Sequence, residues 1–290
     1  MGKPNVLLII TQDTKEQEAR YVRGILEEAG CNVIHLDPSV RRTVGGAEIS
    51  PEAVAAAAGH TIEEVRALGH EGRCQAVMTE GSVNCALRAH AEQGLSGVLS
   101  IGGAMGTGLG GFVLQALPYG LPNLIVSTMA SGFTKPYLGV KDIAIMNAVT
   151  DISGINSISG EVFRNAALAV AGMAKGYVPK TGGNKPLVRV TTLGTTEKTV
   201  RPIREALEAD GCEVMVFHTS GAGGSTLDGI AADRDVALVL DLSMTEILEH
   251  IHGGLADSGP DRGKAAIARG TWRRGNSHPP RHARLLHPAS

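Results

Sequence analysis

Short apolar runs alternate with longer amphipathic stretches in residues 1–178. The apolar runs are typical of strands buried on both faces of a parallel sheet, and they lie at residues 5–10, 32–36, 97–101, 122–127 and 142–146. The amphipathic stretches have helical periodicity, and they cover residues 16–28, 73–93 and 159–175. This alternation predicts an α/β subdomain of the Rossmann-like, doubly wound type with a mostly parallel sheet.

Two helix starts carry strong local signals. Ser50 precedes Pro51, the pattern of a capping hydroxyl followed by proline in the first helical position. Thr61 and Glu64 have the spacing of a capping box. The whole insertion between the second and third strands is too long for an ordinary connection, and we expect it to act as a lid or a dimer arm.

The same layout starts again after residues 179–186, a Pro- and Gly-containing stretch that predicts a linker. Strands are expected at residues 187–192, 213–218 and 237–242, with a helix at 200–210. Residues 187–270 therefore predict a second Rossmann-like α/β subdomain that is incomplete. His218 ends one of its strands and is read either as a polar packing residue or as a general base or anion ligand.

Composition narrows the class of protein. Hydrophobic residues make up 43% of the chain and charged residues 19%, as in a globular protein. A net charge of −2 and only 3% aromatic residues argue against direct nucleic-acid binding. The four cysteines form no CxxC pair, and no apolar run is long enough for a membrane span or is laid out as a signal peptide. We therefore expect a cytoplasmic protein that binds no membrane.

The glycine-rich stretch at residues 102–111 follows a predicted strand and precedes a predicted helix at residues 112–117. Glycines allow the backbone to approach phosphate oxygens, and the free N–H groups of a following helix point at them. The alternative is a tight turn with close packing of the helix on the sheet. The stretch matches neither the P-loop nor a clean dinucleotide-binding motif.

Polar residues follow the other strands at the edge where ligands bind in open α/β sheets. Asp13 and Thr14 are candidate helix caps, and Lys15 in the same turn is a candidate phosphate ligand. Further small polar residues follow the strand that ends at Ser127. No acid–base pair or nucleophile elbow is evident.

Six motifs in order resemble one family. They lie at residues 11–15, 49–54, 102–111, 126–132, 151–156 and 217–224. The family is the bacterial and plant one that includes the ATP-binding N-terminal region of the tomato mosaic virus resistance protein, and the resemblance covers about residues 4–270. It implies two Rossmann-like subdomains, ATP with a divalent ion (Mg²⁺) at the first, and a homodimer. The plant member inhibits viral RNA replication by binding the viral replication protein, whereas the bacterial relatives have no settled reaction.

The resemblance also implies an ATP site, by position. Its residues are Thr11, Asp13, Thr14, Lys15, Gly102, Gly103, Gly106, Thr107, Thr128, Ser131 and Gly132. The family's loop usually reads Gly-Gly-Ser-Gly-Gly-Thr, and here Ala104 and Met105 replace the serine and a glycine. One hydroxyl is lost and bulk is added, and a positive φ at Met105 would be strained.

Residues 271–290 are basic, rich in His and Pro, and lack apolar periodicity. A nucleic-acid arm is one interpretation of such charge. Codons that encode residues 280–288 can, when read one base out of frame, instead encode Pro-Gly-Met-Leu-Asp-Phe-Phe-Ile-Pro. That peptide resembles the family's sequence at this place. We therefore expect a frameshifted, disordered tail and exposed apolar surface near Leu240 and Ile251.

Three functions fit these observations. The first is a nucleotide-binding protein of unsettled reaction, with an ATP-dependent enzyme acting on a small metabolite at the domain cleft as its more specific form. The second is a regulatory or interaction module in which ATP stabilises a dimer surface. The third is an ATP-independent enzyme that holds a carboxylate or sugar acid on the same glycine-rich stretch.

Overall fold

The computed structural model describes residues 2–179, 185–221, 223–227, 236–260, 262–264, 267 and 272–274. The chain divides into two compact units, residues 1–180 and 181–290, each with its own sheet. In the part of the chain described, no helix has the combination of length and apolar character that a membrane span requires.

The first unit is built around a five-stranded parallel sheet. Its strands are β1 (Asn5–Ile9), β2 (Asn32–Leu36), β3 (Leu95–Gly102), β4 (Asn123–Ser127) and β5 (Ala144–Asn147). They lie in the order β2-β1-β3-β4-β5, and all neighbouring pairs run parallel. This order reverses direction between β1 and β3, which makes the space above their carboxyl ends the topological switch point of the sheet. The predicted fold class of the first unit is confirmed.

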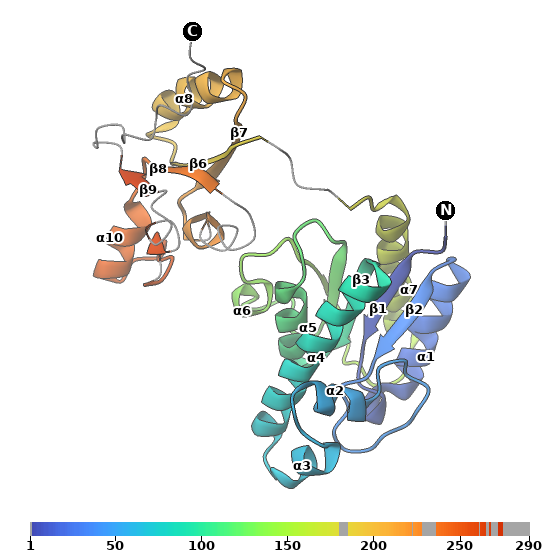
Figure 1. Cartoon of the computed structure of the whole chain (residues 1–290). Helices are drawn as coiled ribbons and strands as arrows, with labels where there is room; N and C mark the ends of the chain where they lie inside the picture. The colour runs from blue at the N-terminus through green and yellow to red at the C-terminus, as the bar shows by residue number, and fades with distance from the viewer. Residues whose placement is uncertain are drawn as a thin grey trace. The chain divides into compact units, whose positions relative to one another are not determined.

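Helices cover both faces of this sheet (Figure 1). They are α1 (Gln12–Glu28), α2 (Pro51–Ala57), α3 (Ile62–Ala67), α4 (Glu71–Gln93), α5 (Ala104–Ala116), α6 (Lys135–Leu138) and α7 (Ser157–Gly176). Alternate residues of β1 enter different cores. Val6 and Leu8 pack with α1 and α7, whereas Leu7 and Ile9 pack with α4 and α5. The continuous apolar runs of the sequence reflect these two covered faces.

Local capping signals were reliable guides to the helix starts. The Ser50 hydroxyl accepts a hydrogen bond from Ala53 N, and Thr61 and Glu64 form the expected capping box. α1 begins at Gln12, but Lys15 departs from helical backbone angles, so the uninterrupted helix starts at Glu16, as expected. The proposed cap at Asp13 or Thr14 is wrong, since both residues lie in the first turn of α1 and the N-cap residue is Thr11, which makes no side-chain cap bond.

The glycine-rich stretch is largely helical, which corrects the predicted turn. Only Gly102 and Gly103 precede α5, and the remaining glycines lie within its first eight residues. A Cβ at Gly110 would lie 2.1 Å from Ser100 Oγ, and one at Gly111 would lie 2.7 Å from the carbonyl oxygen of Tyr137. Close packing of α5 therefore accounts for part of the motif. Met105 is helical and does not have the positive φ that would strain it.

The second unit contains a four-stranded parallel sheet in the order β7-β6-β8-β9. Its elements are β6 (Leu187–Thr192), α8 (Glu197–Ala209), β7 (Glu213–His218), β8 (Val236–Asp241), α10 (Thr245–His252) and β9 (Trp272–Arg274). The sheet has the same relative order as the first four strands of the first unit, which confirms that the layout is repeated.

The strand β9 corrects the expectation of a wholly disordered tail. Trp272 to Arg274 pair in parallel with Val239 to Asp241, so backbone hydrogen bonding extends the sheet into this segment. The residues concerned by the frameshift interpretation, 280–288, lie outside the described residues. The expected exposure of Ile251 is confirmed at 67%, whereas Leu240 is half-buried.

Candidate functional site

A cavity of about 540 Å³ lies at the switch point of the first unit. Residues at the ends of β1 and β3, among them Ile10, Thr11, Gly102 and Gly103, line it. Its volume falls within the roughly 300–1,000 Å³ of pockets that bind small molecules. Open α/β sheets bind ligands at this position because the loops after the two central strands diverge there.

The helices α1 and α5 follow the two central strands, β1 and β3, and begin beside the cavity, and their first turns differ. In α1, Gln12 N donates to Asp37 Oδ1 at 3.0 Å and Asp13 N donates to Ser39 Oγ at 3.0 Å. The end of β2 thus supplies this helix with an internal anion. At α5 the N-cap is Gly103, and no side chain caps the first turn. The positive end of α5 is therefore the one that remains available to an anionic ligand.

Asp37 is a buried carboxylate that accepts several hydrogen bonds. It is 0% exposed, and it also accepts hydrogen bonds from the Ser39 backbone N–H and hydroxyl. Burial raises the pKa of the Asp37 carboxyl above its ordinary value, although these hydrogen bonds oppose the rise. The sequence analysis did not identify Asp37 and Ser39 as partners of the first turn of α1. Both residues follow β2, and no motif next to α1 points to them.

Lys15 supplies a positive charge to the cavity. Its backbone angles, φ −136° and ψ 38°, interrupt the helical geometry of α1. Its Nζ lies 3.4 Å from Thr14 Oγ1, and no carboxylate of the described residues lies within ion-pair distance. Lys15 is half-buried. An amine held in this way has an unused charge for a phosphate or carboxylate.

The insertion between β2 and β3 forms another wall of the cavity. It contributes the basic side chains of Arg41, Arg66 and His70, which the sequence did not identify as site residues. Arg41 pairs with Glu71 at 3.2 Å, and both side chains are exposed. Arg66 Nε donates to the carbonyl oxygen of Val40 at 2.7 Å. The predicted lid function of this insertion stays a prediction, but its residues do reach the cavity.

Seven of the eleven predicted ATP-site residues line the switch-point cavity: Thr11, Asp13, Thr14, Lys15, Gly102, Gly103 and Gly106. Their role in binding stays a prediction. Asp13 also fixes the adjoining loop, since its Oδ2 accepts hydrogen bonds from Val40 N at 3.2 Å and Arg41 N at 3.0 Å.

The other four predicted residues lie outside this cavity. The Thr107 hydroxyl is buried and lies 2.6 Å from Ser127 Oγ and 3.2 Å from the carbonyl oxygen of Gly102. It therefore braces the turn after β3. Thr128 and Ser131 line a separate small cavity, and Gly132 follows them in the same loop.

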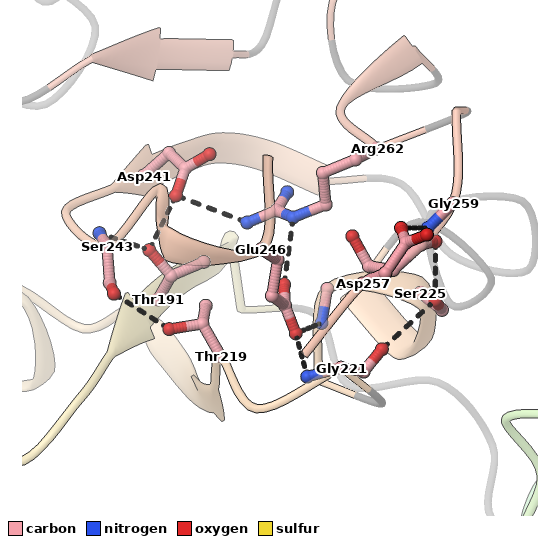
Figure 2. A network of polar contacts seen from close by, with 12 residues as sticks. Thr191, Thr219, Gly221, Ser225, Asp241, Ser243, Glu246, Asp257, Gly259 and Arg262 are labelled. Atoms are coloured by element: carbon pink, nitrogen blue, oxygen red, sulfur yellow. Dashed lines mark hydrogen bonds and ion pairs between the residues drawn. The ribbon is translucent and has the colours of Figure 1, made fainter. Parts of the chain in front are cut away.

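The corresponding edge of the second unit is closed by its own side chains, as Figure 2 shows. Thr191 Oγ1 donates to Asp241 Oδ1 at 2.7 Å and accepts from Leu242 N and Ser243 N. The Thr219 hydroxyl donates to Ser243 Oγ at 2.7 Å. The groups that hold ligands at other switch points are engaged here within the protein.

A buried ion triad completes this closure. Arg262 donates to Asp241 Oδ1 and to Glu246 Oε2, each at 3.2 Å. Glu246 Oε1 in turn accepts from Gly221 N at 2.7 Å and Gly224 N at 3.1 Å, so a carboxylate of the protein occupies this backbone anion cradle. His218 is exposed at the end of β7. The first unit therefore carries the stronger candidate site.

The fold is that of an α/β protein with a cavity at the switch point of a doubly wound parallel sheet. The N-terminal domain of Uncharacterised protein family UPF0261 matches residues 4–179, and the C-terminal domain of the same family matches residues 185–271. The chain belongs to this family.

The chain is similar in sequence to two curated proteins, and one solved structure aligns with it. A UPF0261 protein of Clostridium tetani is 39% identical over 265 residues, which are 90% of this chain and 65% of that protein. The ToMV resistance protein Tm-1(GCR237) of Solanum lycopersicum is 32% identical over 279 residues, covering 88% of this chain and 36% of that protein. A solved structure of Acinetobacter baumannii MurG aligns over 98% of this chain and 88% of its own, but with 15% identity and a TM-score of 0.30. The chain thus spans 65% or less of the length of the two sequence relatives.

Proposed function

We propose that the first unit is a nucleotide-binding module that holds ATP in the switch-point cavity. The observation that carries this proposal is the convergence on one cavity of the uncapped start of α5 and of the Lys15 amine, which forms no ion pair with a described residue. Phosphate oxygens would accept hydrogen bonds from the first-turn N–H groups of α5 and from Lys15. Gly103 permits close approach, because a Cβ there would have only Thr128 Oγ1 within 4 Å, at 3.9 Å.

Mg²⁺ fits the same arrangement as a companion of the phosphates. The described residues contain no cluster of three or more His, Cys, Asp or Glu side chains that would hold a metal unaided. Mg²⁺ is commonly bound by one or two carboxylates together with substrate phosphates. Asp13 provides such a carboxylate, since the described residues donate hydrogen bonds to its Oδ2 but none to its Oδ1. The ion would neutralise phosphate charge next to this carboxylate.

Calorimetric titration of the full chain with ATP, with and without Mg²⁺, tests the proposal. We expect saturable binding that Lys15→Ala weakens about 10- to 100-fold, the effect of losing one hydrogen bond to a charged group. Gly103→Val places a branched side chain where phosphate approaches, so it should weaken binding by at least about tenfold while leaving the unfolding midpoint nearly unchanged.

Lys175→Ala is the matched control. It removes the same charge from the last turn of α7, which ends at the opposite edge of the sheet. Equal affinity of the Lys15 and Lys175 variants would refute the site. If ATP fails to bind but small carboxylates or sugar acids bind in a Lys15-dependent manner, the same cavity serves an ATP-independent protein instead.

Homodimer formation and a cytoplasmic location are further parts of the proposal, and both rest on family resemblance and sequence composition. Sedimentation with and without ATP would show whether the nucleotide stabilises a dimer. No catalytic residue is assigned.

A further inference from the structure

A second, smaller cavity lies at the ends of β4 and β5. Its volume is about 250 Å³, and its lining consists of Thr128, Ser131, Asn147, Val149, Thr150 and Asp151. Two of the motifs singled out in the sequence meet here, residues 126–132 and 151–156. The nucleotide proposal leaves this cavity without a role, because the phosphate ligands named above line the other cavity.

Buried polar contacts hold both walls of this cavity in place. On one side Ser127, which is 0% exposed, accepts a hydrogen bond from Met129 N at 2.9 Å and contacts Thr107. On the other side Glu18, which is 2% exposed, reaches from α1 and accepts a hydrogen bond from Gly154 N at 2.6 Å. Loops that are fixed by buried side chains of the scaffold are the usual support of a preorganised binding site.

The connection between β5 and α7 carries a strained backbone. Val149 has a φ of 65°, and it is the one non-glycine residue with a positive φ among those described. This conformation is unfavourable for a β-branched side chain. Asn147 Oδ1 stabilises the turn by accepting a hydrogen bond from Val149 N at 3.2 Å. The strained turn places Thr150 and Asp151 on the wall of the cavity.

The chemistry of the lining indicates the class of ligand. The structure shows no hydrogen bond from the side-chain hydroxyls of Thr128 and Ser131 to another described residue, so both can donate and accept. Asp151 Oδ1 accepts from Ile152 N, and its second oxygen can accept from a ligand. No Lys, Arg or His lines the cavity, and Asp151 would repel an anion.

We propose that this cavity binds a small, uncharged, polyhydroxylated molecule, such as a polyol or a monosaccharide. Paired hydroxyl groups of such a ligand would donate to Asp151 and exchange hydrogen bonds with Thr128 and Ser131. The volume lies just below the roughly 300–1,000 Å³ of pockets for larger ligands, which suits a molecule of this size. The ligand would lie beside the start of α5, since Thr128 Oγ1 is close to Gly103. This binding does not require that ATP bind.

Methyl NMR of the full chain with labelled threonine tests the proposal directly. The probes are erythritol, D-ribose, D-glucose and myo-inositol, each titrated alone, with inorganic phosphate as the anionic comparison. We expect at least one polyol to shift the methyl signals of Thr128 and Thr150 saturably, while the Thr14 methyl in the switch-point cavity stays in place. Asp151→Asn should weaken that binding about 5- to 10-fold, because an acceptor loses its charge.

Glu161→Gln is the control, since it makes the same charge change at an exposed position of α7. Three outcomes would overturn the proposal: no saturable shift with any polyol, equal binding by the Asp151 and Glu161 variants, or phosphate shifting Thr128 and displacing the polyol. Failure of ATP binding in calorimetry would leave the polyol result unaffected, so the two proposals can fail separately.

Discussion

A methyl group added at Gly110 tests the contact that sets α5 against the sheet and so positions its free end. In Gly110→Ala, the new Cβ would lie 2.1 Å from Ser100 Oγ and 2.9 Å from Ser100 Cβ. Ser100 is 0% exposed in β3, so it cannot swing into solvent. Overpacking of this kind costs about 1–3 kcal/mol, against a gain of about 1 kcal/mol from replacing a helical glycine by alanine.

Gly106→Ala is the matched variant in the same helix. Its Cβ would meet nothing nearer than the carbonyl oxygen of Ile101 at 3.7 Å. It should therefore gain stability by roughly 0.5–1 kcal/mol. The free energies of unfolding of the Gly110 and Gly106 variants should differ by about 2 kcal/mol. Urea unfolding followed by circular dichroism measures this difference, provided that the two m-values agree.

A double-mutant cycle with Ser100→Gly separates the steric clash from other effects. Ser100 Oγ has no hydrogen-bond partner among the described residues, so removing it breaks no polar contact with them. We expect Ser100→Gly to rescue Gly110→Ala with a coupling energy of about 1 kcal/mol or more. Equal midpoints for the Gly110 and Gly106 variants, or a coupling energy near zero, would refute the close approach of α5 to β3.

Three further predictions address single features. Val149→Asn should raise the free energy of unfolding by about 1 kcal/mol, because asparagine tolerates a positive φ. Val178→Asn, at another exposed valine, should not raise it. Equal effects of the two variants in chemical denaturation would contradict backbone strain at Val149. Burial lowers the pKa of His35 below its ordinary 6.5, so protein stability should fall as the pH drops below that value. In thermal melts between pH 7 and 5, His35→Gln should make stability depend less on pH. An unchanged slope of stability against pH would contradict this role of His35. Arg262→Met leaves two buried carboxylates without their ion pair and should destabilise the second unit by about 3 kcal/mol or more. The control Arg41→Met removes an exposed ion pair and should cost under about 1 kcal/mol. Similar losses of stability in urea unfolding would refute the special role of the triad.

The sequence predicted the elements whose signals lie within a few residues of each other. Continuous apolar runs located the strands of the first sheet, because both faces are covered. Ser50 and the Thr61–Glu64 pair marked helix starts, since a capping bond closes over three residues. The alternation of strands and helices predicted the parallel α/β class of both sheets, whereas the order of the strands came from the structure.

Features that depend on distant partners were missed. The start of α1 is set by Asp37 and Ser39, about 25 residues further along the chain. Glycines disfavour helices, yet Gly110 lies in α5 because its absent side chain lets the helix lie close to Ser100 of β3, and Gly111 lies there because it is close to Tyr137. The closure of the second unit joins Glu246 and Arg262, which no motif connects. The sequence therefore placed seven of its candidate residues around one cavity at the carboxyl edge of the sheet, but packing decides which helix end is open there.

The order of strands in the first sheet has a consequence for synthesis of the chain. β1 lies between β2 and β3, and its partner in β3 is about 90 residues away along the chain. At about 5–20 residues per second, a ribosome needs roughly 5 to 20 seconds to make the intervening chain. During that time the apolar β1 has a free edge and lacks part of its cover, a condition that favours aggregation. Efficient production of this protein should thus depend on factors that shield nascent apolar segments until β3 has emerged.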